Sequence, residues 1–238
     1  MEKALRLTRT ASAALLVAIF LIQNAHAVAP PYLYGGAGQH AEGTASVYTT
    51  QISLSTGKFR MHGVAGAGVV GYGLADSWGY FGIQYVTATQ SRPIHAYTTV
   101  AYDGAVRISA IFYFFFGWAR AGAWIRQIIR IYDTSTWQIV TSNTYWVYSE
   151  TVQSGAPWWE NWKERVFNGN TDKFGTSVTF TATAGKTYAI ETFVECQTKV
   201  DGMGWAMSSG IHNFWGPSQK YPNIDGYIKV EEISWYYA

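Results

Sequence analysis

The sequence has little charge, almost no cysteine and no long apolar run in its main part, and each shortage excludes a class of protein. Only 13% of its 238 residues are charged, which argues against a disordered polyelectrolyte and against a protein that coats nucleic acid. The lone cysteine, Cys196, cannot form a disulfide within the chain. Stability must therefore come from packing and from hydrogen bonds between strands.

The first 27 residues have the pattern of a secretory signal peptide. Three basic residues precede an uncharged apolar run from Ala13 to Ile22, and Ala25-His26-Ala27 follows as a small-x-small cleavage site. We predict cleavage after Ala27 and a protein that is secreted or held at the cell surface. Cleavage removes three of 17 basic and one of 15 acidic residues, which leaves 14 of each. A neutral mature chain gives no reason to expect a nucleic-acid partner.

The remaining chain offers no membrane-spanning helix. Its longest strongly apolar run, Ile108 to Ala119, has 12 residues between two arginines. A spanning helix needs about 20 such residues. We therefore expect no integral membrane anchor after signal cleavage.

Alternating side chains predict strands through the centre of the chain. Between Val106 and Phe116 every even position is apolar, as one buried sheet face requires. After Gly117 the odd positions from Ala119 to Ile131 are apolar instead, with Arg120, Trp124, Arg126 and Arg130 on the opposite face. A turn at residues 133–136 then predicts a long hairpin.

The last third repeats this pattern. Ala184-Gly185 predicts a hairpin turn, after which four residues should face the core: Tyr188, Ile190, Val194 and Cys196. Near the C-terminus the apolar phase shifts by one residue at Glu231-Glu232, which predicts a β-bulge. The fold class expected is all-β, an antiparallel β-sandwich of jelly-roll type, with an extended arm at residues 28–44 and one domain at residues 45–238.

Two carboxylates on one predicted strand are the catalytic candidates. Glu191 and Glu195 share the face opposite Ile190 and Val194, and jelly-roll glycosidases use two carboxylates. The pair resembles the signatures of some of these enzymes only in the outer glutamates, because Phe193 stands where a middle carboxylate would be. Four residues of regular strand span about 13 Å, too far for either glycosidase geometry without a bulge. A solvated outer face is the simpler interpretation.

Three tryptophans mark a candidate ligand-binding platform. Trp158, Trp159 and Trp162 fall in the longest loop-like stretch, Gln153 to Gly175. Flat indole faces stack on sugar rings or dock into a partner. The alternative is a small satellite core that packs beneath the loop.

A candidate interface lies on the second face of the central strand. Ile111, Tyr113 and Phe115 alternate with three phenylalanines that are expected to face the core, so both faces there are apolar. We expect the second face to be covered by the tryptophan loop or by another subunit, with the 28–44 arm able to add a strand to a neighbour.

No pattern supports a metal site or a cofactor. The histidines are scattered singly, and the oxygen-bearing run from Asn168 to Asp172 is predicted to be a turn because it lacks the closing acid of a calcium loop. The arginines of the central strand could grip an anionic polymer, but a solvated sheet face is the simpler interpretation.

Two classes of function are favoured. The first is a secreted or cell-surface, non-catalytic β-sandwich with a structural, adhesive or filament-forming role, whose partner is a surface polysaccharide or another copy of itself. The alternative is a carbohydrate-binding module or a jelly-roll glycoside hydrolase. Catalysis is the less favoured of these, and if the protein is an enzyme we expect a glycoside hydrolase.

Overall fold

The computed structural model describes residues 26–68, 70–154, 159–218 and 220–238, and all regular elements in these ranges are strands. No helix in the described ranges is long and apolar enough to span a membrane. In chain order the strands are β1 (His26–Val28), β2 (Tyr34–Gly43), β3 (Ala45–Ser53), β4 (Lys58–Ala67), β5 (Val70–Thr87), β6 (Pro93–Asp133), β7 (Gln138–Gln153), β8 (Glu160–Phe167), β9 (Lys173–Thr181), β10 (Thr187–Phe214) and β11 (Tyr227–Tyr237).

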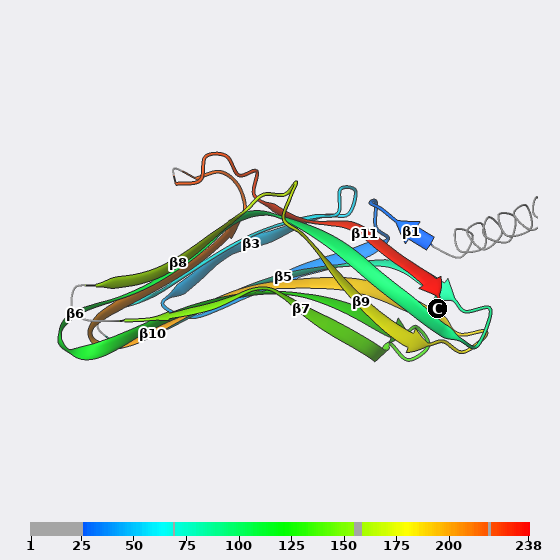
Figure 1. The fold of residues 1–238 in the computed structure, drawn as a ribbon, viewed down its shortest axis with the longest axis horizontal. Coiled ribbons are helices and arrows are strands. Elements are labelled where there is room, and N and C mark those ends of the chain that lie inside the picture. Colours follow the sequence, from blue (N-terminus) through cyan, green and yellow to red (C-terminus); the bar gives the residue numbers. More distant parts are fainter. Residues whose placement is uncertain (1–25, 69, 155–158, 219) are drawn as a thin grey trace, which may run out of the picture.

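The strands make one antiparallel sheet that is folded over on itself, so that it forms the two layers of a sandwich. In the first layer, sheet I, the order is β2-β5-β10-β6-β7. In the second, sheet II, β3 and β4 lie beside the later part of β10, which lies beside the earlier part of β6 and then β8. Strands β6 and β10 are long enough to run through both layers, so hydrogen bonding never breaks between them (Figure 1).

Contacts within single strands show that the two layers face each other. In β10, Thr198 lies 3.4 Å from His212, which is 14 residues further along the same strand. In β6, the Tyr102 hydroxyl donates to Gln127 Oε1 across 3.3 Å. A strand can touch itself in this way only when it doubles back over a second layer. The predicted all-β antiparallel sandwich is confirmed.

The fold line of the sheet, which we call the crease, lies at one end of the elongated molecule (Figure 1). Among the described residues, Thr44 joins β2 to β3 there, Gly68 follows β4, and β6 and β10 bend around Gly117 and Gly204. Both glycines have positive φ, +135° and +77°, a backbone conformation that side chains disfavour. The bend of the long strands therefore depends on glycine.

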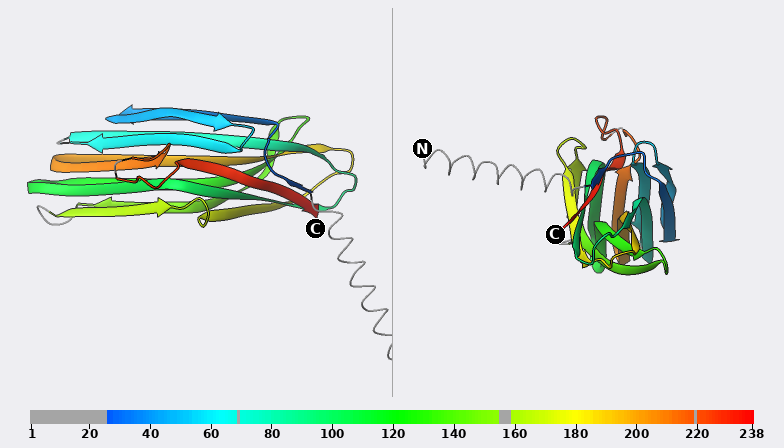
Figure 2. Two further views of the ribbon diagram at one scale, coloured as in Figure 1. Left: turned by 90° about the horizontal axis from the view of Figure 1, so that it is seen from above. Right: turned by 90° about the vertical axis from the view of Figure 1, so that its right-hand side faces the viewer.

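The other end of sheet II is completed by β11 and β9. Strand β11 continues the line of β10 between β4 and β6, while β9 continues the line of β8 along the far edge of β6. Short β1 pairs with Ile233 to Trp235 of β11. Seen from above, these strands lie side by side along the molecule's length (Figure 2).

The core between the layers follows the alternation expected from sequence. Tyr188, Ile190, Val194 and Cys196 are all buried, and the register slips between Val230 and Glu232, where the bulge was predicted. The inner faces also hold stacked aromatic rings, with Phe59 4.4 Å from Phe81 between ring centroids. Within residues 28–44, predicted to be an extended arm, Tyr34–Gly43 forms β2. This strand pairs with β5 of the same chain.

Two predicted turns have a different role in the structure. Ala184-Gly185 does turn the chain, but β9 pairs only with β6 while β10 enters the other layer, so this is a crossing between sheets and not a hairpin. Asp103-Gly104 also has the composition of a turn, which predicts a break between two strands, but it lies within β6. The Asp103 carboxylate accepts hydrogen bonds from the backbone of Gly169, Asp225 and Gly226, so it supports neighbouring loops.

The candidate interface is also corrected. Phe116, expected to face the core, is 67% exposed because the alternation ends where β6 bends at the crease. Ile111 and Tyr113 are half-buried, and the side chains of Phe114 and Phe115 lie outside the described part. In the described part of the Gln153 to Gly175 stretch, β8 extends the sheet at the edge of β6 and does not lie over this face.

Candidate functional site on the concave face of sheet I

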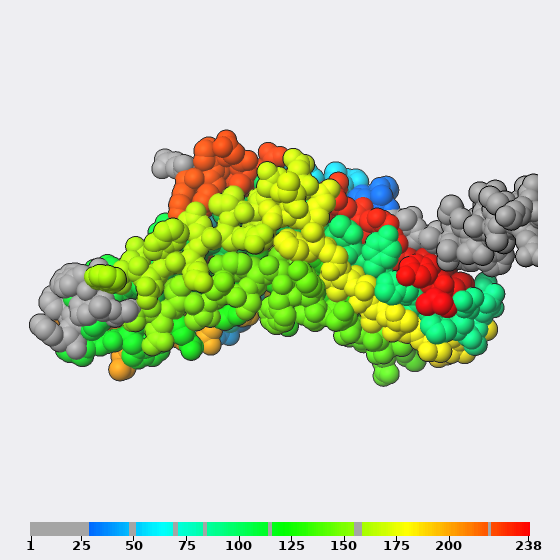
Figure 3. All heavy atoms as spheres, in the orientation of Figure 1, coloured from blue at the N-terminus to red at the C-terminus, as the bar shows by residue number. Residues whose placement is uncertain are grey.

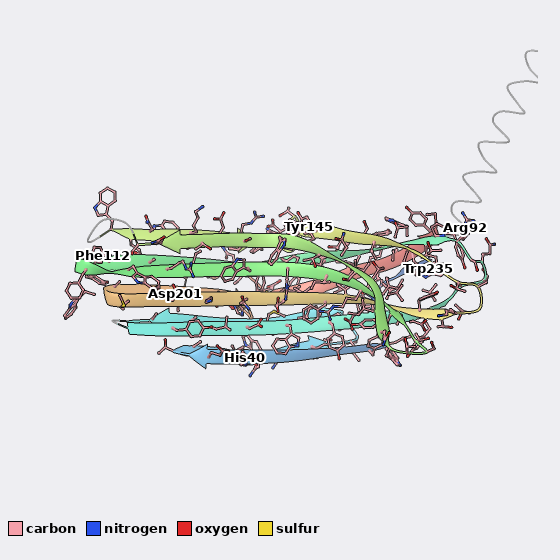
Figure 4. All side chains as sticks on the ribbon, turned by 90° about the horizontal axis from the view of Figure 1, so that it is seen from below. His40, Arg92, Phe112, Tyr145, Asp201 and Trp235 are labelled. Atoms are coloured by element: carbon pink, nitrogen blue, oxygen red, sulfur yellow. The ribbon has the colours of Figure 1, made fainter. Side chains whose placement is uncertain are left out.

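The outer face of sheet I forms the hollow underside of an arched molecule (Figure 3). Figure 4 looks onto this face and shows β7, β6, β10, β5 and β2 in that order, with His40 and Asp201 on it. Side chains here come from every second residue of each strand, so the face continues across neighbouring strands in register. A concave sheet of this kind can receive an extended ligand along its length.

Aromatic rings lie over glycines on this face. Trp78 and Tyr80 of β5 lean over Gly38 and Gly36 of β2, where any added methyl group would overlap the rings. Two more pairs repeat the arrangement, Tyr34 over Gly82 and Trp124 over Gly122. All four aromatic side chains are half-buried. Each ring therefore lies with one side against the backbone, and part of its surface remains exposed on this face.

Charged side chains form a ladder of pairs between β6 and β10. Arg130 donates to Glu191 across 3.2 Å, Arg126 donates to Glu195, and Arg120 donates to Asp201 across 3.1 Å. The interpretation of this face as simply solvated was wrong for Glu191, which is only 6% exposed. Its pKa is raised by burial, although Arg130 and the Tyr132 hydroxyl act in the opposite direction.

The pairing within this ladder shows whether the arginines of β6 are available to an anionic polymer. Each of the three arginines has a carboxylate partner on the neighbouring strand. Arg130 in addition lies 3.9 Å above the ring of Phe193, and Arg126 lies 5.9 Å from the ring of Trp146. The face is therefore close to neutral, with many hydrogen-bonding groups but no excess of one sign.

Asp76 is the most perturbed acid on this face. It lies on β5 opposite Gln197, one step diagonally from Glu195. Burial and the negative charge of Glu195 raise its pKa to about 6, against the lowering effects of Arg126, His40 and a hydrogen bond from Gln197. Cross-strand diagonal positions are about 7–8 Å apart. The structure thus brings Glu195 near a second carboxylate, but this partner is Asp76 and not Glu191.

A small pocket opens at the crease end of the face. Its volume is about 220 Å³, and it is lined by Arg120, Gly122, Trp124, Thr151, Lys199 and Asp201. Enclosed sites for small organic ligands are usually about 300–1,000 Å³. The pocket can therefore hold only part of a larger ligand, with the rest on the open face.

The tryptophans predicted as a platform lie elsewhere. Trp162 is in β8 of sheet II and is 56% exposed, and Trp159 just before that strand is 71% exposed. Neither packs beneath a loop as a satellite core. Trp158 lies outside the described residues. Their strand belongs to the layer opposite the concave face, so they do not join the site described here.

Sequence reasoning missed Tyr34, Asp76, Trp78 and Tyr80. The signal was present in β5, where Tyr72, Leu74, Asp76, Trp78 and Tyr80 alternate with glycine, alanine and serine. Two glycines of β5 leave room for rings: Gly82 lies under Tyr34 of neighbouring β2, and Gly79 lies under Phe59 of the facing layer.

Comparison with known proteins gives only distant similarity. No family model matches the sequence, and no curated protein matches it. The chain is similar to the C-terminal carbohydrate-binding module, CBM6, of LamC, a marine laminarinase from Zobellia galactanivorans, with 10% identity over 75% of this chain and 99% of that one, and a TM-score of 0.25.

Two further structures are similar at the same level. One is the module CBM6cm-2 from Cellvibrio mixtus lichenase 5A in complex with cellotriose, with 9% identity over 74% of this chain and 95% of that one, and a TM-score of 0.26. The other is BiXyn10A CBM1, with 8% identity over 90% and 97% and a TM-score of 0.28. Superpositions this loose assign no function to the chain.

Proposed function

We propose that this protein is a secreted or cell-surface, non-catalytic β-sandwich that binds a neutral polysaccharide along the concave face of sheet I. The observation that carries the proposal is the set of four aromatic rings held over glycines, which present flat faces to the hollow. Sugar rings stack on such faces through their C–H groups, and carbohydrate sites combine them with a few placed polar groups. Holding a surface polysaccharide would also give the protein an adhesive role.

The polar groups of the face support a neutral ligand. The arginine and carboxylate side chains of the ladder keep hydrogen-bonding capacity beyond the bonds that join them, and they suit hydroxyl groups as donors and acceptors. A polyanion would have to compete with the carboxylates already paired to the arginines. The pocket beside Trp124 would then receive one sugar unit or a branch, while the chain continues over the open face.

A panel of immobilised polysaccharides tests the proposal. The chain should bind at least one neutral glycan, and Trp124→Ala should weaken that binding by about tenfold or more, because a stacking surface is lost. Trp162→Ala is the matched control, since Trp162 is 56% exposed on β8 of sheet II, the layer opposite the concave face. Binding that is equal for both variants, or binding to polyanions alone, would contradict the proposal.

A second candidate, glycoside hydrolysis, is favoured by one observation. Asp76, with its pKa raised to about 6, stands diagonally beside Glu195, and an acid kept protonated near an ionised carboxylate is the arrangement that glycosidases use. Release of reducing sugar from the bound polysaccharide measures this directly. Hydrolysis that is abolished by Asp76→Asn while binding persists would establish it, and a bound glycan that stays intact would reject it.

A further inference from the structure

The crease end of the molecule carries exposed large apolar side chains. Five residues from β6, from β10 and from the segment just before β8 are 39% to 71% exposed there: Phe116, Trp118, Met203, Met207 and Trp159. Trp205, between the two methionines, is 50% exposed. Pairing brings them to one end, since Trp118 lies opposite Met203 and Gly117 opposite Gly204. We call this group the crease cap.

The crease cap lies among residues that carry no charge. The described residues on either side of the crease contain no Asp, Glu, Lys or Arg: 43–53, 61–68, 70–75, 108–119, 151–154, 159 and 202–214. All the charges that flank the crease therefore stand back from it. Figure 4 places Phe112 at this end and Arg92 near the opposite one.

The depth of the uncharged zone can be estimated on sheet I. Arg120 is three residues from the bend at Gly117 and is paired with Asp201 on the neighbouring strand. At about 3.3 Å per residue, the first charges lie about 10 Å from the crease. Amphipathic elements that rest in a bilayer interface bury their apolar groups about 5–10 Å deep. The uncharged zone next to the crease is therefore about as deep as the bilayer interface in which such elements rest.

We propose that the crease cap inserts into the interfacial region of a phospholipid bilayer. Tryptophan and methionine suit this layer, because indole combines an apolar body with a polar N–H and the thioether chain adapts to irregular surroundings. Strand pairing between β6 and β10 reaches Phe112 opposite Ala206 on one side of the bend and Gly117 opposite Gly204 on the other, so it satisfies the backbone polar groups that flank the bend.

The charges at the rim point to a zwitterionic surface. Arg120 is held by Asp201, and Arg107 lies 3.6 Å from Glu160, so these two arginines of the rim offer no unbalanced positive charge to anionic headgroups. Binding should therefore depend on the apolar side chains and only weakly on salt. The crease lies at one end of the long axis, away from most of the concave face of sheet I, which stays open to a polysaccharide (Figure 1).

Flotation of the full chain with phosphatidylcholine vesicles tests the inference. The protein should float with the vesicles, by a similar fraction at about 50 and about 500 mM NaCl, and with little gain when phosphatidylserine is added. The double variant Phe116→Ser with Trp205→Ser should lower partitioning by about tenfold or more. Trp137→Ser at the opposite end is the matched control and should float as the parent does.

Other results would overturn the inference. One is that the protein does not float with phosphatidylcholine vesicles. Another is that flotation requires phosphatidylserine and disappears in high salt. A third is that Trp137→Ser lowers flotation as much as the double variant does. Self-association through the cap would show in light scattering as oligomers that the double variant abolishes, without vesicle binding. If the double variant does not fold, Trp159→Ser provides the same comparison from the segment before β8, outside both bent strands. Polysaccharide binding is measured for all variants as well. A variant that no longer floats but still binds polysaccharide shows that the two proposals stand or fall separately.

Discussion

The two faces of sheet I are made by the same strands but have opposite chemistry. On β10, Val194, Cys196 and Thr198 are fully buried, whereas Phe193, Glu195 and Gln197 between them face the hollow. The inner face holds the layers together, and the outer face holds aromatic rings and paired charges. Because a strand alternates its side chains, stability and recognition can be placed on separate faces of one sheet. Substitutions should then affect one property without the other.

The largest expected difference between the faces comes from two aromatic residues. Phe59 is fully buried, stacks on Phe81 and lies over Gly79 of sheet I. Phe59→Ala should lower the free energy of unfolding by about 3–5 kcal/mol, because it leaves a cavity between the layers. Trp146→Ala on the outer face, where the side chain is 52% exposed, should cost less than about 1 kcal/mol. Urea unfolding measures the stability of both variants. Equal losses of unfolding free energy would contradict the assignment of stability to the inner face.

His212 should make the inner face sensitive to acid. It is buried, lies 2.8 Å from the Ser77 hydroxyl, and burial lowers its pKa to about 3. Since the unfolded chain takes up a proton near pH 6.5 and the folded chain does not, this stabilisation is present above pH 6.5 and is lost as pH falls toward 3. The loss attributable to His212 should be about 4 kcal/mol.

The measurement is urea unfolding of the parent and of His212→Asn between pH 7 and pH 3. The parent should lose more stability over this range than the variant, which lacks the titrating group. Parallel curves for the two proteins would show that His212 does not differ between the folded and unfolded states.

Cys196 offers a smaller test of the inner face. Its side chain is fully buried beside the apolar core, and burial raises the pKa of its thiol well above the usual value. Cys196→Ser should destabilise by about 1–3 kcal/mol, because the hydroxyl loses water and the packing is poorer. Rapid labelling of the thiol in the native protein would show that this strand face is open, contrary to the comparison.

Asp76 gives the smallest effect and the opposite sign. Its pKa is raised to about 6, so the folded state favours the protonated acid, and that stabilisation is lost as pH rises from about 4 through 6. Asp76→Asn should therefore stabilise the protein by about 1 kcal/mol at pH 7, a value reduced for solvent screening because the group is only half-buried. The gain should vanish near pH 4. Equal stability of the two proteins at pH 7 would argue that the acid is better solvated than the fold indicates.

The sequence predicted what alternation can show and missed what depends on partners across strands. The buried phase of β10, the bulge near Glu232 and the outward arginines of β6 were all predictable, because each depends on a short repeat in one segment. The pairing of Glu191 and Glu195 with Arg130 and Arg126 was not, since it depends on the register of two strands about 60 residues apart. The crossing of β9 into β10 likewise looked like a hairpin, because a turn alone does not tell which layer the next strand enters.

The folded sheet has a consequence for how the chain can reach its native state. Contacts across the layers near the crease join residues close in sequence, such as Thr198 and His212, which are 14 residues apart. Farther away the separation within β6 grows to 25 residues, between Tyr102 and Gln127. The bond from the Tyr32 hydroxyl to the Val230 carbonyl joins residues 198 apart. Since closing a short loop costs less entropy than closing a long one, the layers should come together first at the crease and zip toward the opposite end, with the N- and C-terminal strands added last.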